Sequence, residues 1–243
     1  MISLLSIIPI RSEARESSEM VSQLLFGEEA EVLETSGSWS RIRTQHDDYE
    51  GWVDTKMLSD GTIGEEVALV VSPSAVIEYD GCQFPVTLGV KFPIAENGIF
   101  KIDDKEFRLI DGIVSEDTLD MEEALGIMKA MLRTPYLWGG RTPWGIDCSG
   151  FSQLFYRLQG VDLPRDASQQ VKCGDDIFLQ EAQAGDLAFF EKEGRITHVG
   201  ILLDNKTIIH ASGWVRIDAI DANGIFVKES QSYSHKLLRV KRM

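Results

Sequence analysis

One cysteine and two histidines stand where they can form a nucleophile and its base. Cys148 follows Asp147 and precedes Ser149-Gly150, a pattern typical of a helix that begins at the cysteine. A thiol at a helix N-terminus is favoured as the thiolate, because unpaired amides and the positive end of the dipole face it. His198 and His210 follow on strand-like runs. We therefore predict Cys148 as nucleophile and His198 as its general base.

The two histidines fall on a predicted β-hairpin whose turn is Asp204-Asn205-Lys206. Residues opposite each other in an antiparallel pair share a face of the sheet. Because 198 and 210 differ by an even number, they share a face only if the loop has an odd number of residues or a bulge restores the phase. We expect a three-residue loop or its equivalent. The imidazoles would then be neighbours, with His210 orienting His198 as in a catalytic triad.

Two other interpretations of these residues stay open. A free cysteine commonly packs as a small buried hydrophobe, although Gly145 and Ser149-Gly150 are poor core neighbours. Zinc is the second alternative, with Cys148, His198 and His210 as ligands. The local ligand pairs expected of such a site, for example Cys-x-x-Cys, are absent. The sequence therefore predicts no metal and no other cofactor.

Further candidates flank the cysteine. The backbone N–H of Cys148 is a candidate oxyanion donor. Tyr136 precedes the nucleophile closely, and its hydroxyl either donates to an oxyanion or substrate, or belongs to a half-buried aromatic residue. Ser168 follows Pro164 and is expected to cap a short helix.

Two helices and several strands are predicted to position these residues. Asp120 and Glu123 form a capping box, and an apolar stripe follows before Pro135 ends the first helix. The second helix begins at Asp147 and stops at Gly160. Strand-like runs then occupy residues 186–190, 198–203, 207–211, 225–228 and 237–240. Helices followed by antiparallel strands predict an α+β domain over residues 117–243.

The part of the chain before residue 116 is predicted to be all-β. Short strand-like runs alternate with Gly, Ser and Asp clusters, at residues 30–34, 39–43, 49–53, 67–71, 84–86, 98–102 and 106–110. The turn between the last two is expected at Asp103-Asp104-Lys105. The runs form two clusters of similar size. We therefore predict two small barrels, over residues 1–62 and 63–116.

Composition excludes several classes of partner. The net charge of −15 over 243 residues would repel phosphates, so nucleic acid is not an expected partner. No run approaches the ~18 apolar residues that would span a membrane. Three cysteines, an odd count, argue against a disulfide framework. The apolar first ten residues lack a basic n-region and are expected to form a β-strand. We expect a cytoplasmic protein, or a periplasmic or secreted one if a leader was removed, of undetermined oligomeric state.

Six residue blocks resemble the NlpC family of bacterial cell-wall cysteine peptidases, and they occur in the family's order across residues 120–243. They are Tyr136-Leu137-Trp138-Gly139-Gly140, Asp147-Cys148-Ser149-Gly150, Leu163-Pro164-Arg165, Ala184-Gly185-Asp186-Leu187, His198-Val199-Gly200-Ile201 and Ile209-His210-Ala211. The resemblance implies a compact papain-like α+β fold. By position it implies Cys148 as nucleophile, His198 as base and His210 as the third member, with Tyr136 assisting the oxyanion site.

Residues 1–115 resemble bacterial SH3-like domains, on the strings Ile10-Arg11-Ser12-Glu13-Ala14, Leu24-Leu25-Phe26-Gly27-Glu28 and Gly51-Trp52-Val53. A second, divergent copy is expected over residues 63–116. Two such modules before an NlpC domain resemble the γ-D-glutamyl-L-diamino acid endopeptidases. The resemblance implies peptidoglycan-derived peptides as substrates, cut after D-glutamate when the L-alanine amine is free, in murein recycling or turnover. The leaving residue would be diaminopimelate or lysine.

A free substrate ammonium needs a carboxylate partner in a confined site. The resemblance implies Asp147 as that partner, with Ser168 beside it. Tyr49 and Glu13 are the candidates from the SH3-like module, which would close the pocket. Two other functions stay open: a non-catalytic cell-wall-binding protein, and an acyltransferase or amidase on the same scaffold.

Overall fold

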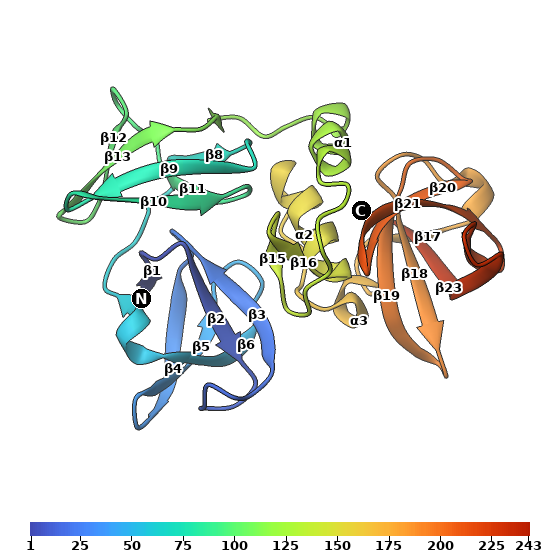
Figure 1. Cartoon of the computed structure of the whole chain (residues 1–243), viewed down its shortest axis with the longest axis horizontal. Helices are drawn as coiled ribbons and strands as arrows, with labels where there is room; N and C mark the ends of the chain where they lie inside the picture. The colour runs from blue at the N-terminus through green and yellow to red at the C-terminus, as the bar shows by residue number, and fades with distance from the viewer. The chain divides into compact units, whose positions relative to one another are not determined.

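The computed structural model describes all residues from 1 to 243, and the chain divides into two compact units, Met1–Thr118 and Leu119–Met243 (Figure 1). None of the helices has the length and apolar character needed to cross a bilayer. The finer division at residue 62 stays a prediction. Within the N-terminal unit, the core formed by the later strands also contains Ile2, Leu25 and Phe26 from the earlier ones.

The first half of the N-terminal unit is a five-stranded antiparallel sheet of order β3-β2-β6-β5-β4. The strands are β2 (Ile7–Arg11), β3 (Met20–Leu25), β4 (Ala30–Ser36), β5 (Trp39–Thr44) and β6 (Glu50–Asp54). The prediction of one continuous opening strand is wrong. The chain forms β1 (Ile2–Ser3), which pairs with β7 (Leu58–Ser59) after the single turn η1 (Thr55–Met57), and starts β2 afresh.

The second half holds a four-stranded sheet of order β10-β9-β13-β12 and a three-stranded sheet of order β11-β8-β14. The strands are β8 (Val67–Val70), β9 (Ser74–Tyr79), β10 (Cys82–Thr87), β11 (Lys91–Pro93), β12 (Ile99–Ile102), β13 (Lys105–Asp111) and β14 (Val114–Ser115). The predicted hairpin turn is present but shorter. Ile102 pairs with Lys105, so only Asp103-Asp104 turn, and Asp103 takes a positive φ of 51°. Stacked phenylalanines fill the core between the sheets, with Phe92 and Phe100 centroids 4.6 Å apart.

In the C-terminal unit, both predicted helices form where capping residues start them. Asp120 and Glu123 close a capping box on α1 (Met121–Ala130). Asp147 caps α2 (Cys148–Leu158), and Gly160 takes a left-handed φ of 81° just after it. Every residue of α2 is buried, and the helix packs against strands β19 and β20. The hairpin β15 (Arg141–Thr142) and β16 (Gly145–Ile146) precedes α2, and the single turn α3 (Ala167–Gln170) follows it.

The strands of this unit form one antiparallel sheet of order β17-β23-β18-β19-β20-β21-β22. Because β22 also pairs with β23, strands β18 to β23 close into a six-stranded barrel (Figure 1). The strands are β17 (Asp175–Ile177), β18 (Leu187–Lys192), β19 (Arg195–Leu202), β20 (Thr207–Ser212), β21 (Trp214–Asp221), β22 (Gly224–Val227) and β23 (Ser232–Arg242), with the turn η2 (Leu179–Glu181) before β18. Strand β21 was not predicted from the sequence, and it carries part of the candidate site.

Candidate active site

Cys148 is the first residue of α2, as predicted. The Asp147 side chain accepts a hydrogen bond of 2.7 Å from the Gly150 amide, which fixes the start of the helix. The cysteine is only 8% exposed. The backbone N–H of Val199, the residue that follows His198 on β19, lowers the pKa of this thiol, and α2 packs against β19. The fold therefore brings the thiol against the strand that carries the predicted base.

The resting protonation of this thiol differs from the prediction. Burial, reinforced by the neighbouring Asp147 carboxylate, raises the pKa of Cys148 to about 12, although the Val199 and Ser149 amides and Arg165 act in the opposite direction. The prediction of a resting thiolate is therefore wrong. The carboxylate that caps the helix also offsets its positive end, so the sulfur keeps its proton until a base takes it.

The histidine hairpin has the predicted geometry. Ile201 pairs with Ile209, and the Leu203 amide donates to the Thr207 carbonyl, which leaves a three-residue loop. The even spacing then places both imidazoles on one face, and His198 Nε2 lies 2.8 Å from His210 Nδ1. One detail is wrong: β19 begins at Arg195, so His198 lies inside the strand instead of opening it. Since Nε2 is engaged with His210, Nδ1 is the nitrogen of His198 that remains for the sulfur.

Both imidazoles are buried and neutral. Burial, together with His210 and His235, lowers the pKa of His198 well below its ordinary value. Burial also lowers the pKa of His210, although the hydrogen bond to Asp218 raises it in part. A neutral imidazole has a free lone pair and can accept a proton.

Strand β21 adds two residues that sequence reasoning missed. His210 Nε2 lies 2.9 Å from Asp218 Oδ2. Arg216 donates to both oxygens of the same carboxylate, from Nη2 at 2.7 Å and from Nε. Burial alone would raise the pKa of Asp218, but the hydrogen bonds from His210 and Arg216 outweigh it and lower the pKa to about 2. Asp218 is therefore an ionised carboxylate at the end of the histidine pair.

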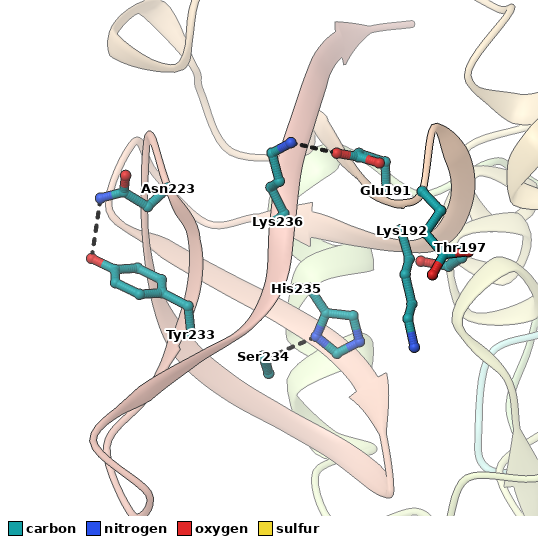
Figure 2. A pocket seen from close by; sticks show the side chains of 9 residues that line it. Glu191, Lys192, Thr197, Asn223, Tyr233, Ser234, His235 and Lys236 are labelled. Carbon is teal, nitrogen blue, oxygen red and sulfur yellow. Dashed lines mark hydrogen bonds and ion pairs between the residues drawn. The ribbon is translucent and has the colours of Figure 1, made fainter.

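A third histidine, also missed by sequence reasoning, stacks on His198. His235 on β23 stacks on His198, with ring centroids 4.2 Å apart and planes 26° apart. Burial lowers the pKa of His235 to about 4. Its ring lies in a pocket of about 570 Å³, and Ser234 hydrogen-bonds to its Nδ1 at 2.8 Å (Figure 2). The stack fixes the plane of the His198 ring.

Asp147 has a second partner besides the helix. The guanidinium of Arg165, 1% exposed, bonds both of its oxygens at 3.0 and 2.5 Å, and also bonds Ser149 Oγ at 2.9 Å. The Gly139 amide donates to Oδ2 at 2.9 Å. A carboxylate has about four lone-pair positions, so both oxygens of Asp147 are fully engaged.

Tyr136 lies close to Cys148. Its backbone N–H donates to the Gly213 carbonyl at 2.9 Å, which holds the residue at the end of β20. Burial, together with the neighbouring Cys148 and Asp147, raises the pKa of Tyr136. The hydroxyl therefore stays protonated and can donate a hydrogen bond near the sulfur.

With this geometry in place, comparison with known proteins identifies the domains. Residues 133–234 match the sequence model of the NlpC/P60 family, and residues 10–58 match that of the bacterial dipeptidyl-peptidase SH3 domain. The chain carries an NlpC/P60 domain preceded by an SH3 domain of this type. The match of residues 133–234 to this family, together with relatives named dipeptidyl-peptidases, supports a peptidase. The second SH3-like copy over residues 63–116 stays a prediction.

Two curated relatives are similar over most of the chain. The Gamma-D-glutamyl-L-lysine dipeptidyl-peptidase of Bacillus subtilis (strain 168) is 29% identical over 211 residues, which cover 78% of this chain and 71% of the relative. The protein of the same name from Bacillus cereus is 25% identical over 228 residues, covering 80% and 68%. A crystal structure of an NlpC/P60 family protein from Bacillus cereus superposes with a TM-score of 0.82 at 20% identity, covering 99% of this chain and 98% of that one. The superposition shows that the whole fold is shared.

Three predicted substrate-binding residues remain. Ser168 lies exposed on α3 of the NlpC/P60 domain, and it does not cap that helix, because Asp166 is the N-cap. Glu13 and Tyr49 belong to the N-terminal unit. The Glu13 carboxylate is exposed and pairs with Arg15 at 2.9 Å, and the Tyr49 amide donates to Thr44 Oγ1 at 2.9 Å. The roles of all three in substrate binding stay predictions.

Proposed function

We propose that the chain is a cysteine peptidase that hydrolyses the γ-D-glutamyl bond to a diamino acid in peptidoglycan-derived peptides with a free N-terminal L-alanine, in peptide recycling or turnover. The observation that carries the proposal is the packing of α2, which begins at Cys148, against β19, whose His198 ring is already held by His210. The names of the two Bacillus relatives support the γ-D-glutamyl bond, with L-lysine as the leaving residue. A nucleophile at a helix start against a base on a strand is also the papain-like arrangement that we propose for this domain.

In the proposed mechanism, His198 Nδ1 takes the thiol proton as the sulfur attacks the γ-carbonyl carbon of D-glutamate. The oxyanion forms near the Cys148 amide and the Tyr136 hydroxyl, which donate to it. The imidazolium then protonates the amine of the leaving diamino acid, and a thioester remains. Water attacks the thioester with His198 again as base, which releases the dipeptide L-alanyl-D-glutamate. Because the thiol and the imidazole are both neutral at rest, proton transfer accompanies the attack.

The proposed requirement for a free amine concerns two carboxylates in different settings. Asp147 can take a substrate ammonium only by giving up Arg165, and breaking a buried ion pair costs about 3–5 kcal/mol. The exposed Glu13–Arg15 pair is exchanged far more easily, because such pairs contribute about 0–1 kcal/mol. Asp147 and Glu13 therefore both stay candidates for the carboxylate that receives the ammonium, and Asp147 also fixes the start of α2.

The test uses the full chain with L-alanyl-γ-D-glutamyl-L-lysine and the corresponding diaminopimelate peptide, with products identified by mass spectrometry. Cys148→Ala is expected to abolish hydrolysis, while the matched control Cys82→Ala, at an exposed cysteine, leaves it unchanged. Acetylating the substrate amine is expected to reduce cleavage at least ~10-fold. Turnover by Cys148→Ala would refute the nucleophile. Binding without products would indicate a wall-binding protein, and products joined to an added amine would indicate an acyltransferase.

A further inference from the structure

A line of three hydrogen-bonding groups ends at the predicted base: Asp218, then His210, then His198. An ionised carboxylate has no proton to give, so it can only accept. His210 must therefore donate from Nε2 to Asp218. A neutral imidazole carries one N–H, so His210 Nδ1 has a lone pair and accepts. The hydrogen bond between the two histidines must then be donated by His198 Nε2 to His210 Nδ1.

With these protons assigned, Nδ1 of His198 keeps a free lone pair, and it lies on the side of the ring away from His210 and Asp218. We propose that Asp218 is a positioning residue that sets the tautomers of both histidines, and thereby gives His198 the unprotonated Nδ1 that can take the thiol proton. The inference deepens the proposed peptidase function and rests on it. It concerns a residue that touches neither the substrate nor the sulfur, and acts through two imidazoles.

Arg216 holds the Asp218 carboxylate in one orientation. Its guanidinium bonds both oxygens of Asp218, so the carboxylate can neither rotate nor take up a proton easily. Arg216 is itself held by Glu229 at 2.9 Å and lies over the Trp214 ring, 5.1 Å from its centroid. The carboxylate is therefore held with Oδ2 toward His210.

No other neighbour competes for the imidazole protons in this line. Phe190 on β18 contacts the His198 ring and is apolar. His235 on β23 stacks flat on His198, a geometry in which ring nitrogens do not hydrogen-bond each other, and its low pKa keeps it uncharged at neutral pH. The opposite tautomers would place a lone pair of His210 Nε2 against the Asp218 oxygen 2.9 Å away, with no proton between them. The charge of Asp218 thus decides the direction of both hydrogen bonds.

The experiment reads the tautomers directly. The full chain is labelled with ring-¹⁵N histidine, and long-range ¹H–¹⁵N correlations assign the protonated nitrogen of each of its four histidines near neutral pH. We expect His198 and His210 both to carry the proton on Nε2. A proton on His198 Nδ1 would overturn the proposal. This measurement needs no substrate, so it stands or falls separately from the peptidase activity.

A variant then tests Asp218 as the cause. In Asp218→Asn an N–H₂ group replaces one acceptor oxygen, so the single tautomer of His210 is expected to be lost and kcat to fall about 10²-fold with little change in KM. The matched control is Asp221→Asn on the same strand, whose carboxylate bonds Tyr233 and no histidine. It should keep both tautomers and the activity. Unchanged tautomers in a folded Asp218→Asn would refute the role. If that variant does not fold, the measurement on the unaltered chain still decides.

Discussion

Removing the guanidinium of Arg165 is expected to destabilise the C-terminal unit severely, through the start of α2. Arg165 is 1% exposed, and its hydrogen bonds include two to Asp147 and one to Ser149. In Arg165→Met the buried Asp147 carboxylate loses its only cation among these bonds. Leaving such a charge unpaired costs about 3–5 kcal/mol, a large part of the ~5–15 kcal/mol that holds a domain folded.

The double variant separates the charge from the packing. In Asp147→Asn combined with Arg165→Met, the unpaired charge is gone, although the helix keeps a capping side chain, since asparagine caps about as well as aspartate. The double variant should therefore recover about 1–3 kcal/mol relative to Arg165→Met alone.

The assay is differential scanning calorimetry of the full chain, fitted with a separate transition for each of the two units. We expect the transition of the C-terminal unit to move down in Arg165→Met and partly back in the double variant, while that of the N-terminal unit stays in place. A loss below ~1 kcal/mol in Arg165→Met, or a double variant no more stable than it, would show that the Asp147 charge does not need this partner.

Three further outcomes are expected. The pKa of His235 is about 4 in the folded chain, below its ordinary value of about 6.5, so the unfolded chain binds more protons between these values and the free energy of unfolding falls as the pH drops from 6.5 to 4. His235→Phe keeps a ring but cannot titrate, so in urea melts its free energy of unfolding should fall about 1–2 kcal/mol less over this range than that of the unaltered chain, after discounting for the exposed part of His235. An equal loss would refute this. Because the pKa of Cys148 is about 12, iodoacetamide near pH 7 should modify it more slowly than the exposed Cys82, and faster modification would reveal a thiolate. In Gly200→Ala the added Cβ would lie 2.8 Å from His210 Cβ, so the ring must move and kcat should fall ~10-fold, an effect that unchanged kinetics would exclude.

The parts of the site that follow local rules were predicted from the sequence. Asp147 marked the start of α2 because the N-cap pattern depends only on adjacent residues. The pairing of His198 and His210 followed from loop parity, which is fixed by counting along one hairpin. Both features belong to continuous stretches of chain, where the order of residues decides the geometry.

Strand β21 was missed because its polar face points inward. Val215 and Ile217 alternate with Arg216 and Asp218, a pattern that normally places charged residues in water. Here Asp218 is buried, because its neighbours across the sheet are the histidine strand and not solvent. A charged residue on a buried face is stable only when it is paired, and the sequence alone did not reveal the pairing with His210.

The position of His235 and the protonation of Cys148 could not be predicted from the sequence, because both depend on contacts between distant parts of the chain. The contact of His235 with His198 depends on how β23 lies beside β18 and closes the barrel, and these strands are far apart in the sequence. The resting thiolate was wrong because the helix dipole is a local effect, whereas the desolvation of Cys148 arises from the whole fold around it.

The ionised groups around Cys148 and His198 suit the charge separation that the proposed mechanism requires. At rest the thiol and the three imidazoles are neutral, and each nearby carboxylate is paired with an arginine: Asp147 with Arg165, and Asp218 with Arg216. In the proposed mechanism the thiol proton moves to His198. A positive charge then appears on the imidazole line that ends at the Asp218 carboxylate, and a negative charge appears at the amides that start α2. Dipoles and charges already in place cost no reorganisation at that moment. The two arginines thus pair with both buried carboxylates, and no net charge lies on the thiol or the imidazoles before substrate binds.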